Sequence, residues 1–458
     1  MNKYDAIIIG SGQGGTPLAK RLANSGWRTA IVEKQWIGGT CINTGCTPTK
    51  TMIASAKTAY TISKASYMGI VVGEHRVNFK AVMSRKNKVV ESFRNGGKHG
   101  LKQTENLDLI FGKASFIGEK QIEVCRQKDN AIEITADKIF IDTGGRAAIP
   151  EIDGLSTISY LTSSSILELK ELPQHLLIIG GGYIGLEFGK MFKRYGSEVT
   201  ILQNGVRLLP REDEDIARSV HQILEEENIR ICLKSEVSDV QKNHDHITVH
   251  VSIEGRQESI DCTHVLIATG RAPNTEDLDL QKTGVTVDHA GHIIVNEYLE
   301  TSMRGIYAIG DVKGGPEFTH ISYNDYVILA DNILENKKIS THDRMVPYCM
   351  FIDPQLGRIG ITEMEAEKKG LKYKVTTLPM ERVARAVETG DTRGFMKAIV
   401  EESSGKILGA AILCQEGGEV MTMLQLAMAG GITAPQLKEM VFAHPLYAES
   451  LNNLFVKI

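Results

Sequence analysis

The chain has 458 residues, of which 42% are hydrophobic and 24% charged, values typical of a globular protein of about three domains. The formal net charge of -4 argues against nucleic acid as a partner, and no apolar run approaches the ~18 residues that would span a bilayer. The start of the chain lacks the apolar core of a signal peptide, so we expect a cytoplasmic protein that binds neither nucleic acid nor membranes.

The first predicted elements are a strand, a glycine turn, a helix and a second strand. An apolar strand at residues 6–9 leads into Gly10, Gly12 and Gly15, a helix is predicted at about 17–24, and a strand at 29–32 precedes Glu33. We call this the first glycine motif. Its spacing is typical of a βαβ dinucleotide site, in which glycines permit the turn and the pyrophosphate meets a helix N-terminus. Glu33 is placed to accept hydrogen bonds from ribose hydroxyls.

A close pair of cysteines, Cys41 and Cys46, follows directly. The seven cysteines are an odd number, and the other five are scattered, so the sequence does not read as a secreted disulfide framework. One close pair beside a cofactor site indicates catalytic or metal-binding thiols, and electrons could pass from the cofactor to sulfur. The alternative is that both are buried structural thiols. We predict no resident metal site.

A second glycine motif repeats the first. A strand at residues 176–179 leads into Gly180, Gly182 and Gly185, with a helix predicted from about 186 to 195 and a strand at 198–202. Gln203 follows the first glycine by the same 23 residues that separate Glu33 from Gly10. An amide does not repel a 2′-phosphate as a carboxylate would, which favours NADPH over NADH. Arg207 and Arg211 could pair with that phosphate, or could be solvated surface residues.

Further strands end in residues that suit nucleotide sites. Residues 139–142 and 265–268 each precede a Thr-Gly pair, and the strand at 306–309 ends in Gly310 and Asp311. In an open α/β sheet, an acid at the carboxyl end of a strand points into the ligand crevice.

Together these motifs resemble the class I pyridine nucleotide-disulfide oxidoreductases, which include dihydrolipoyl dehydrogenase, glutathione reductase and mercuric reductase. The motifs are GGTCxNxGCxPxK at 38–50, GGGYIGLE at 180–187, ATGRxPN at 268–274, IYAIGD at 306–311, and His-Pro with Glu at 444–449. Within the family the chain most resembles mercuric-reductase-like and RclA-like flavoproteins.

The resemblance implies an α/β fold with two Rossmann-like dinucleotide-binding domains plus a C-terminal α+β dimerisation domain. The implied boundaries are 1–145 and 275–344 for the FAD-binding domain, 146–274 for the NAD(P)-binding domain and 345–458 for the dimerisation domain. The implied cofactors are FAD and either NADPH or NADH.

The resemblance also implies roles for individual residues. The implied FAD contacts are Gly10, Gly12, Gly15, Glu33, Lys50, Thr143, Gly144, Asp311, Phe318 and Thr319, the last two through their backbone. The implied contacts of the nicotinamide cofactor are Gly180, Gly182, Tyr183, Gly185, Gln203 and Gly270, with Tyr183 as an aromatic gate. Glu187 is expected to pair with Lys50 near the flavin ring.

The implied reaction carries electrons from NAD(P)H through FAD to a Cys41–Cys46 disulfide. Cys46 would be the thiol nearer the flavin and Cys41 the one that meets the substrate. Histidine suits proton transfer near pH 7, and the resemblance assigns it to His444, oriented by Glu449. In relatives this pair serves the other subunit, so we expect a homodimer.

The acceptor is expected to be a small-molecule disulfide or a metal ion. No cysteine follows Cys414, whereas mercuric reductases carry a C-terminal pair, which argues against mercury reduction of the usual type. One alternative is a dihydrolipoyl dehydrogenase of a 2-oxo acid dehydrogenase complex, although Phe442 and Gln203 depart from that pattern. Another is a non-enzymatic thiol redox sensor, against which both glycine motifs and the His-Glu pair argue.

Overall fold

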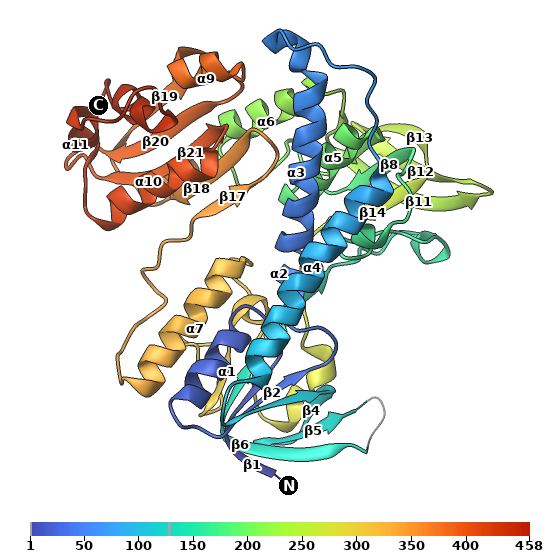
Figure 1. Cartoon of the computed structure of the whole chain (residues 1–458), viewed down its shortest axis with the longest axis vertical. Helices are drawn as coiled ribbons and strands as arrows, with labels where there is room; N and C mark the ends of the chain where they lie inside the picture. The colour runs from blue at the N-terminus through green and yellow to red at the C-terminus, as the bar shows by residue number, and fades with distance from the viewer. Residues whose placement is uncertain (1, 127–129) are drawn as a thin grey trace. The chain divides into compact units, whose positions relative to one another are not determined.

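The computed structural model describes residues 2–126 and 130–458 (Figure 1). The chain divides into two compact units. Unit 1 comprises Met1–Thr51, Met83–Ala148 and Gly270–Arg344. Unit 2 comprises Met52–Val82, Ile149–Thr269 and Met345–Ile458.

Unit 1 is built on a largely parallel sheet with strand order β3-β2-β1-β6-β5-β4 and β16 on β6. The parallel strands are β1 (Asn2–Ile9), β2 (Thr29–Glu33), β3 (Leu107–Phe111), β6 (Ile132–Ile141) and β16 (Ile306–Ala308). The antiparallel strands are β4 (Lys113–Gly118) and β5 (Gln121–Cys125).

Both faces of this sheet are covered, which explains why its central strands are continuous apolar runs. Alternate residues of β1 belong to different buried hydrophobic clusters, because successive side chains of a strand point to opposite faces of the sheet. Ile8 packs with Leu18 of α1 (Gly15–Asn24) and Ile328 of α7 (Thr319–Leu334). Ile7 packs with Phe116 of β4 on the other face.

The connections after β2 carry the cysteine pair. Cys41 lies in α2 (Gly39–Asn43), and Cys46 is the first residue of α3 (Cys46–Ser63). The chain passes between the units within α3 and returns within α4 (Phe79–Lys102). A short pair, β7 (Gly145–Ala147) and β15 (Arg271–Pro273), completes unit 1.

The first part of unit 2 is a second parallel sheet, with order β10-β9-β8-β14. Its elements are β8 (His175–Ile179), α5 (Tyr183–Tyr195), β9 (Glu198–Leu202), α6 (Glu214–Glu226), β10 (Arg230–Cys232) and β14 (His264–Ile267). An antiparallel sheet of β11 (Ser235–Asn243), β12 (His246–Ile253) and β13 (Arg256–Cys262) is inserted before β14. Helix α5 begins at Tyr183, three residues before the predicted start, because residues 183–185 are already helical directly after Gly182.

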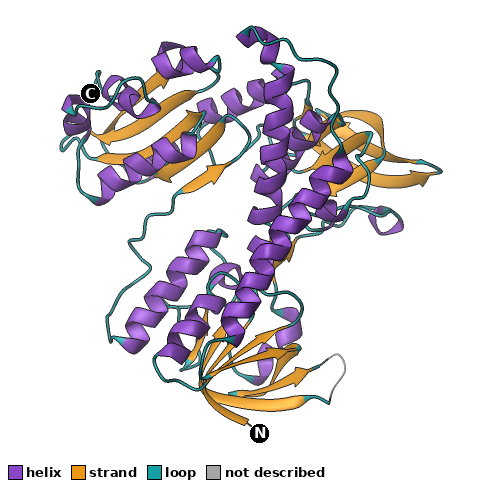
Figure 2. Ribbon diagram, viewed as in Figure 1, coloured by secondary structure: helices purple, strands orange, loops and turns teal. Residues whose placement is uncertain are grey.

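The C-terminal part of unit 2 is an antiparallel sheet with order β17-β18-β21-β20-β19. Figure 2 draws its strands in orange and its helices in purple. Its strands are β17 (Tyr348–Met350), β18 (Gln355–Gly360), β19 (Tyr373–Pro379), β20 (Phe395–Glu401) and β21 (Ile407–Cys414). Its helices are α8 (Glu363–Lys368), α9 (Ala384–Thr389), α10 (Gly417–Ala429), α11 (Ala434–Glu439) and α12 (Ser450–Leu454). Helix α10 packs on β18 and β21, where Met421 and Leu424 join the buried core with Ile412.

Short 3-10 helices connect these elements. They are η1 (Ala65–Met68), η2 (Leu155–Thr157), η3 (Ser165–Glu168), η4 (Glu276–Leu278), η5 (Leu280–Lys282), η6 (Gly310–Lys313), η7 (Met380–Arg382) and η8 (Tyr447–Glu449). The two parallel sheets and the C-terminal antiparallel sheet with its helices confirm the predicted fold class. None of the helices described combines the length and apolar character that a membrane crossing requires.

Candidate active site

The first glycine motif forms the tight turn that the sequence predicts. Gly10 has φ 105°, and a Cβ there would lie 2.2 Å from the carbonyl oxygen of Asp142, so only glycine fits. The backbone N–H of Ser11 donates to Glu33 at 3.1 Å, and its hydroxyl donates to the same carboxylate oxygen at 2.6 Å. Glu33 is thereby fixed at the turn, at the end of β2.

The surroundings of this turn fit a dinucleotide such as FAD. Helix α1 begins at Gly15 and directs its N-terminal N–H groups and partial positive charge towards the turn. Gly144 has φ 67° with open space where a Cβ would stand. Asp311 begins the turn η6 with Gly310 and pairs with Arg271 at 2.8 Å. The buried Nε of Arg271 lies 3.5 Å from a carboxylate oxygen of Glu317, so two acids hold this guanidinium beside the turn.

The remaining predicted FAD residues of unit 1 lie on the same strand ends and helix starts. The Thr143 hydroxyl donates to the carbonyl of Asn274 at 2.8 Å. Lys50 lies in the first turns of α3. Phe318 precedes the first residue of α7, and its ring stacks on His320 at a centroid distance of 5.3 Å.

The second glycine motif reproduces the same turn in unit 2. A Cβ on Gly180 would lie 2.3 Å from the carbonyl oxygen of Ala268, whereas Gly182 faces open space. A Cβ on Gly185 would lie 2.2 Å from the Gly180 carbonyl oxygen, so helix and strand need this glycine to pack closely. The Gly181 N–H donates to Oε1 of the buried Gln203 at 2.9 Å. Gln203 therefore takes the structural place that Glu33 takes in unit 1.

Other predicted residues of the nicotinamide site have varied surroundings. Tyr183 is partly exposed at the start of α5. Glu187 is buried and accepts the N–H of Phe351 at 2.8 Å. Arg207 donates to the carbonyl of Pro210 at 3.2 Å. Gly270 belongs to unit 1, and the predicted Lys50–Glu187 pair joins different units, so both placements stay predictions.

The cysteine pair lies in unit 1 between two helix starts. Thr319 is the first residue of α7, and its hydroxyl oxygen lies 3.3 Å from the Cys46 Sγ. Cys46 is exposed. A hydrogen bond to Cys46 and then burial raise the pKa of the Cys41 thiol, whereas Thr319 and Lys50 act to lower it. The two thiols are thus in contact, and the exposure of Cys46 does not match a buried structural pair.

Thr319 makes a side-chain contact that the sequence did not reveal. We expected its backbone to contact the flavin, but its hydroxyl lies beside a sulfur 273 residues earlier in the chain. Spacing could not signal this contact, because it depends on where α7 begins relative to α3.

His444 and Glu449 form a pair in unit 2. Nδ1 of His444 lies 2.9 Å from the nearer carboxylate oxygen of Glu449, and the imidazole is two-thirds exposed. A carboxylate on Nδ1 fixes the ring orientation and leaves Nε2 to exchange a proton with another group. The Tyr447 hydroxyl, 3.0 Å from the Thr389 hydroxyl, anchors the intervening segment.

An acidic cluster elsewhere in unit 2 already holds a cation. Among the residues that the structure describes, Asp213, Asp215 and Glu363 could jointly ligate a metal. However, the buried Lys397 ammonium contacts all three, at 2.9 Å from Asp215. The cluster is therefore an ion network that joins α6 to the C-terminal sheet.

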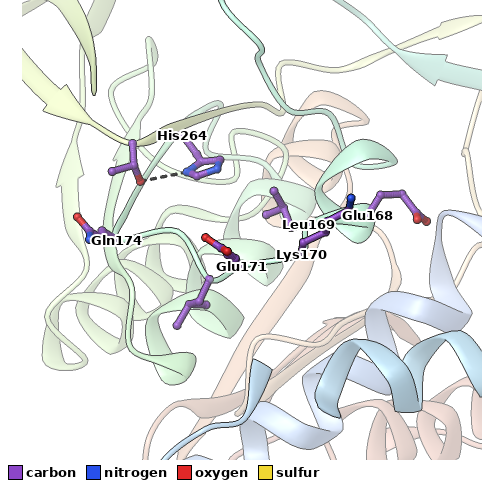
Figure 3. A pocket seen from close by; sticks show the side chains of 8 residues that line it. Glu168, Leu169, Lys170, Glu171, Gln174 and His264 are labelled. Atoms are coloured by element: carbon purple, nitrogen blue, oxygen red, sulfur yellow. Dashed lines mark hydrogen bonds between the residues drawn. The ribbon is translucent and has the colours of Figure 1, made fainter. Parts of the chain in front are cut away.

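A surface pocket of about 590 Å³ lies at the amino ends of the strands of the second parallel sheet, opposite the second glycine motif (Figure 3). It is lined by Glu168, Leu169, Lys170, Glu171, Leu172, Gln174, Thr263 and His264. His264 begins β14, its Nδ1 lies 3.0 Å from the Thr263 hydroxyl, and burial lowers its pKa. Ligands of open α/β sheets bind at the carboxyl ends of the strands. This pocket is at the amino ends, so it is not the predicted coenzyme site.

Comparison with known proteins defines the class. The family model of the pyridine nucleotide-disulphide oxidoreductases matches residues 4–325, and the model of their dimerisation domain matches residues 346–455. The chain belongs to this family. It is a flavoprotein enzyme of the class that uses FAD and NAD(P)H.

Particular relatives refine this assignment. The chain is 41% identical over 459 residues to the probable pyridine nucleotide-disulfide oxidoreductase RclA of Escherichia coli, covering 99% of each chain. A mercuric reductase of Staphylococcus aureus is 35% identical over 98% of this chain and 81% of its own length. A solved Cu(II) complex of the HOCl-induced flavoprotein disulfide reductase RclA from Escherichia coli matches with a TM-score of 0.91 and 40% identity, covering 99% of each chain.

These findings confirm the predicted family, fold class, enzyme class and cofactors. They favour an RclA-like reductase over the dihydrolipoyl dehydrogenase alternative, and the enzyme class argues against a non-enzymatic sensor. The domain boundaries and the roles of individual residues stay predictions.

Proposed function

We propose that the chain is an RclA-like reductase that uses NAD(P)H to reduce a disulfide or a thiol-bound metal ion through Cys41 and Cys46. The observation that carries this proposal is the contact between an exposed Cys46 and Cys41 in the unit that holds the first glycine motif. Proximity of a thiol pair to a cofactor cradle is what electron transfer from cofactor to sulfur requires.

The proposed cofactor residues follow from the two turns. Gly10, Gly12, Gly15 and Glu33 would hold the adenosine half of FAD, and Asp311 the ribityl chain. Gly180, Gly182, Gly185 and Gln203 would hold the nicotinamide coenzyme, with Tyr183 over its ring. Bound FAD supplies the two-electron couple between the coenzyme and the disulfide.

The thiols of this chain would perform the exchange with the acceptor. A Cys41 thiolate attacks one sulfur of the acceptor disulfide, which releases the other as a thiolate and leaves Cys41 in a mixed disulfide. The Cys46 thiolate then attacks Cys41, releases the second thiolate and restores the Cys41–Cys46 disulfide. A metal ion would instead be bound by the two sulfurs before reduction.

The protons for the released thiolates would come from His444. Its Nδ1 is held by Glu449, so Nε2 can donate to a leaving sulfur. We propose that this pair serves the thiols of a second protomer. The match of residues 346–455 to the family's dimerisation domain supports a homodimer.

We also propose NADPH as the preferred coenzyme and a cytoplasmic location. Gln203 presents an uncharged amide where an acid would repel a 2′-phosphate. A transient, catalytic disulfide is the kind that occurs in the cytosol, where other thiols are kept reduced.

An acceptor screen tests the proposal. Wild type and the Cys41→Ser and Cys46→Ser variants would be compared for oxidation of NADH and NADPH with lipoamide, glutathione disulfide, Hg(II) and Cu(II). Cys125→Ser, an exposed thiol of the same unit, is the control. We expect at least one acceptor whose reduction needs both Cys41 and Cys46 but not Cys125. Reduction of every active acceptor by both variants at the wild-type rate would exclude the thiol mechanism.

A further inference from the structure

The two glycine motifs differ at one buried position directly behind the turn. A Cβ on Gly10 would touch the carbonyl oxygen of Asp142, and a Cβ on Gly180 would touch that of Ala268. The backbone N–H groups of Asp142 and Ala268 each donate, at 2.8 Å, to the carbonyl oxygen of the residue before the glycine. Asp142 and Ala268 are therefore structurally equivalent, and only the first motif has a carboxyl group there.

This carboxyl group lies against the turn and the start of α1. Asp142 Oδ2 accepts the N–H of Gly15 at 2.8 Å. A Cβ on Gly12 would lie 2.6 Å from the same oxygen, and one on Gly15 would lie 2.7 Å from it. The carboxyl thus fills the space beneath the glycines and binds an amide at a helix terminus that, in this motif, faces the cofactor diphosphate.

Within the described chain, the acidic neighbours of Asp142 are each paired with a cation, whereas Asp142 itself is not. Its acidic neighbours are Asp311 and Asp325. Asp311 pairs with Arg271 at 2.8 Å, and Asp325 pairs with Arg344 and with Lys313 at 3.4 Å. Asp142 itself is bound by the amides of Gly15 and Gly12, and no cation pairs with it in the part of the chain that the structure describes.

The protonation of Asp142 reflects this environment. Burial first, and then the charges of Asp311 and Asp325, raise the pKa of Asp142 well above its usual value, against the effect of the two amides. A diphosphate at the turn adds negative charge close by, which disfavours the ionised carboxylate further.

We propose that Asp142 couples binding of the cofactor diphosphate to uptake of one proton. The inference rests on the proposed placement of FAD on the first glycine motif. When Asp142 is ionised, binding of the diphosphate is accompanied by protonation of the carboxylate. When Asp142 is already neutral, binding involves no proton. Affinity for FAD therefore falls as pH rises through the window between the two states, by at most about tenfold per pH unit.

Titration of the apoprotein with FAD and with ADP tests this coupling. Calorimetry from pH 6 to 10, in two buffers of different ionisation enthalpy, gives both the dissociation constant and the number of protons taken up. We expect the wild-type dissociation constants to rise by about tenfold or more across this range, with proton uptake approaching one. Asp142→Asn, which keeps the shape but cannot ionise, should remove both effects, as should Asp142→Ala, which copies Ala268.

Asp137→Asn, a change to an exposed acid of the same unit, is the control and should behave as wild type. Wild-type binding without pH dependence or proton uptake would overturn the inference, as would an unchanged slope in Asp142→Asn. A protein that binds neither FAD nor ADP at any pH would contradict the proposed placement of FAD. If the variants do not fold, wild-type proton uptake decides alone.

Discussion

The sulfur of Cys46 lies 3.3 Å from the hydroxyl oxygen of Thr319, so the start of α7 meets the start of α3 at this thiol. A hydroxyl in this position can donate a hydrogen bond to a thiolate, and the bond it forms with a neutral thiol is much weaker. Hydrogen bonds to charged acceptors are about twice as strong as neutral ones. The contact therefore favours the nucleophilic form of Cys46.

Thr319→Val should weaken that form. In a Cys41→Ser background, we expect alkylation of Cys46 near neutral pH to slow by up to about tenfold, because one charge-assisted hydrogen bond to the thiolate is lost. The measurement is the rate of alkylation by iodoacetamide as a function of pH. Thr319→Ser keeps the hydroxyl and should restore the wild-type curve. Identical curves for Val and wild type would show that the hydroxyl does not act on the thiolate.

Gln203→Glu should shift coenzyme preference towards NADH. The variant keeps an oxygen to accept the Gly181 N–H and adds a negative charge that repels a 2′-phosphate. We expect the ratio of kcat/KM for NADPH to that for NADH to fall by about tenfold or more. Arg211→Ala, measured beside it, reports whether that arginine contributes. A ratio that does not change in Gln203→Glu would remove the basis for NADPH preference.

Glu449→Gln should slow the thiol steps selectively. The carboxylate holds Nδ1 of His444 at 2.9 Å, and its loss leaves the imidazole less well oriented for proton transfer. We expect reduction of a disulfide acceptor to fall by about 10- to 100-fold. Ferricyanide reduction, which needs no proton transfer to sulfur, should persist. Glu439→Gln on α11 is a control, and an equal loss of both activities in Glu449→Gln would indicate a structural role instead.

Lys190 gives a prediction for stability. It is buried on α5 with its Nζ 3.0 Å from Glu227, and burial lowers its pKa from 10.5 to about 8. Below pH 8 Lys190 is charged in both the folded and the unfolded protein, so folding bears the full cost of burying this charge. Between pH 8 and 10.5 the unfolded chain holds more of the proton, so this residue's contribution to the unfolding free energy rises with pH.

Lys190→Met should remove this dependence. The difference in unfolding free energy between wild type and variant should change in favour of wild type by up to about 3 kcal/mol across that window. Glu227 would keep Arg194 and Arg393, each at 2.8 Å. Urea unfolding at pH 7.5 and pH 10 measures the change, with Lys193→Met on the same helix as the control. A constant difference would mean that Lys190 titrates normally.

Local features of the site could be predicted from the sequence, and distant contacts could not. Gly10 and Gly180 were predictable because a tight turn with positive φ leaves a glycine signature at fixed spacing. His444 and Glu449 are five residues apart, so one segment brings them together. Asp142 lies 127 residues from Gly15, and Thr319 lies 273 from Cys46. Only the packing of whole elements creates those contacts, and no periodicity in the sequence records them.

Anaerobic reduction of the holoenzyme tests the central claim most directly. A flavin and a disulfide each accept two electrons, so the wild type should take up about four per protomer. Cys41→Ser and Cys46→Ser should each take up about two, because neither can form the disulfide. A wild-type protein that accepts only two electrons, or a variant that still accepts four, would contradict electron transfer through Cys41 and Cys46.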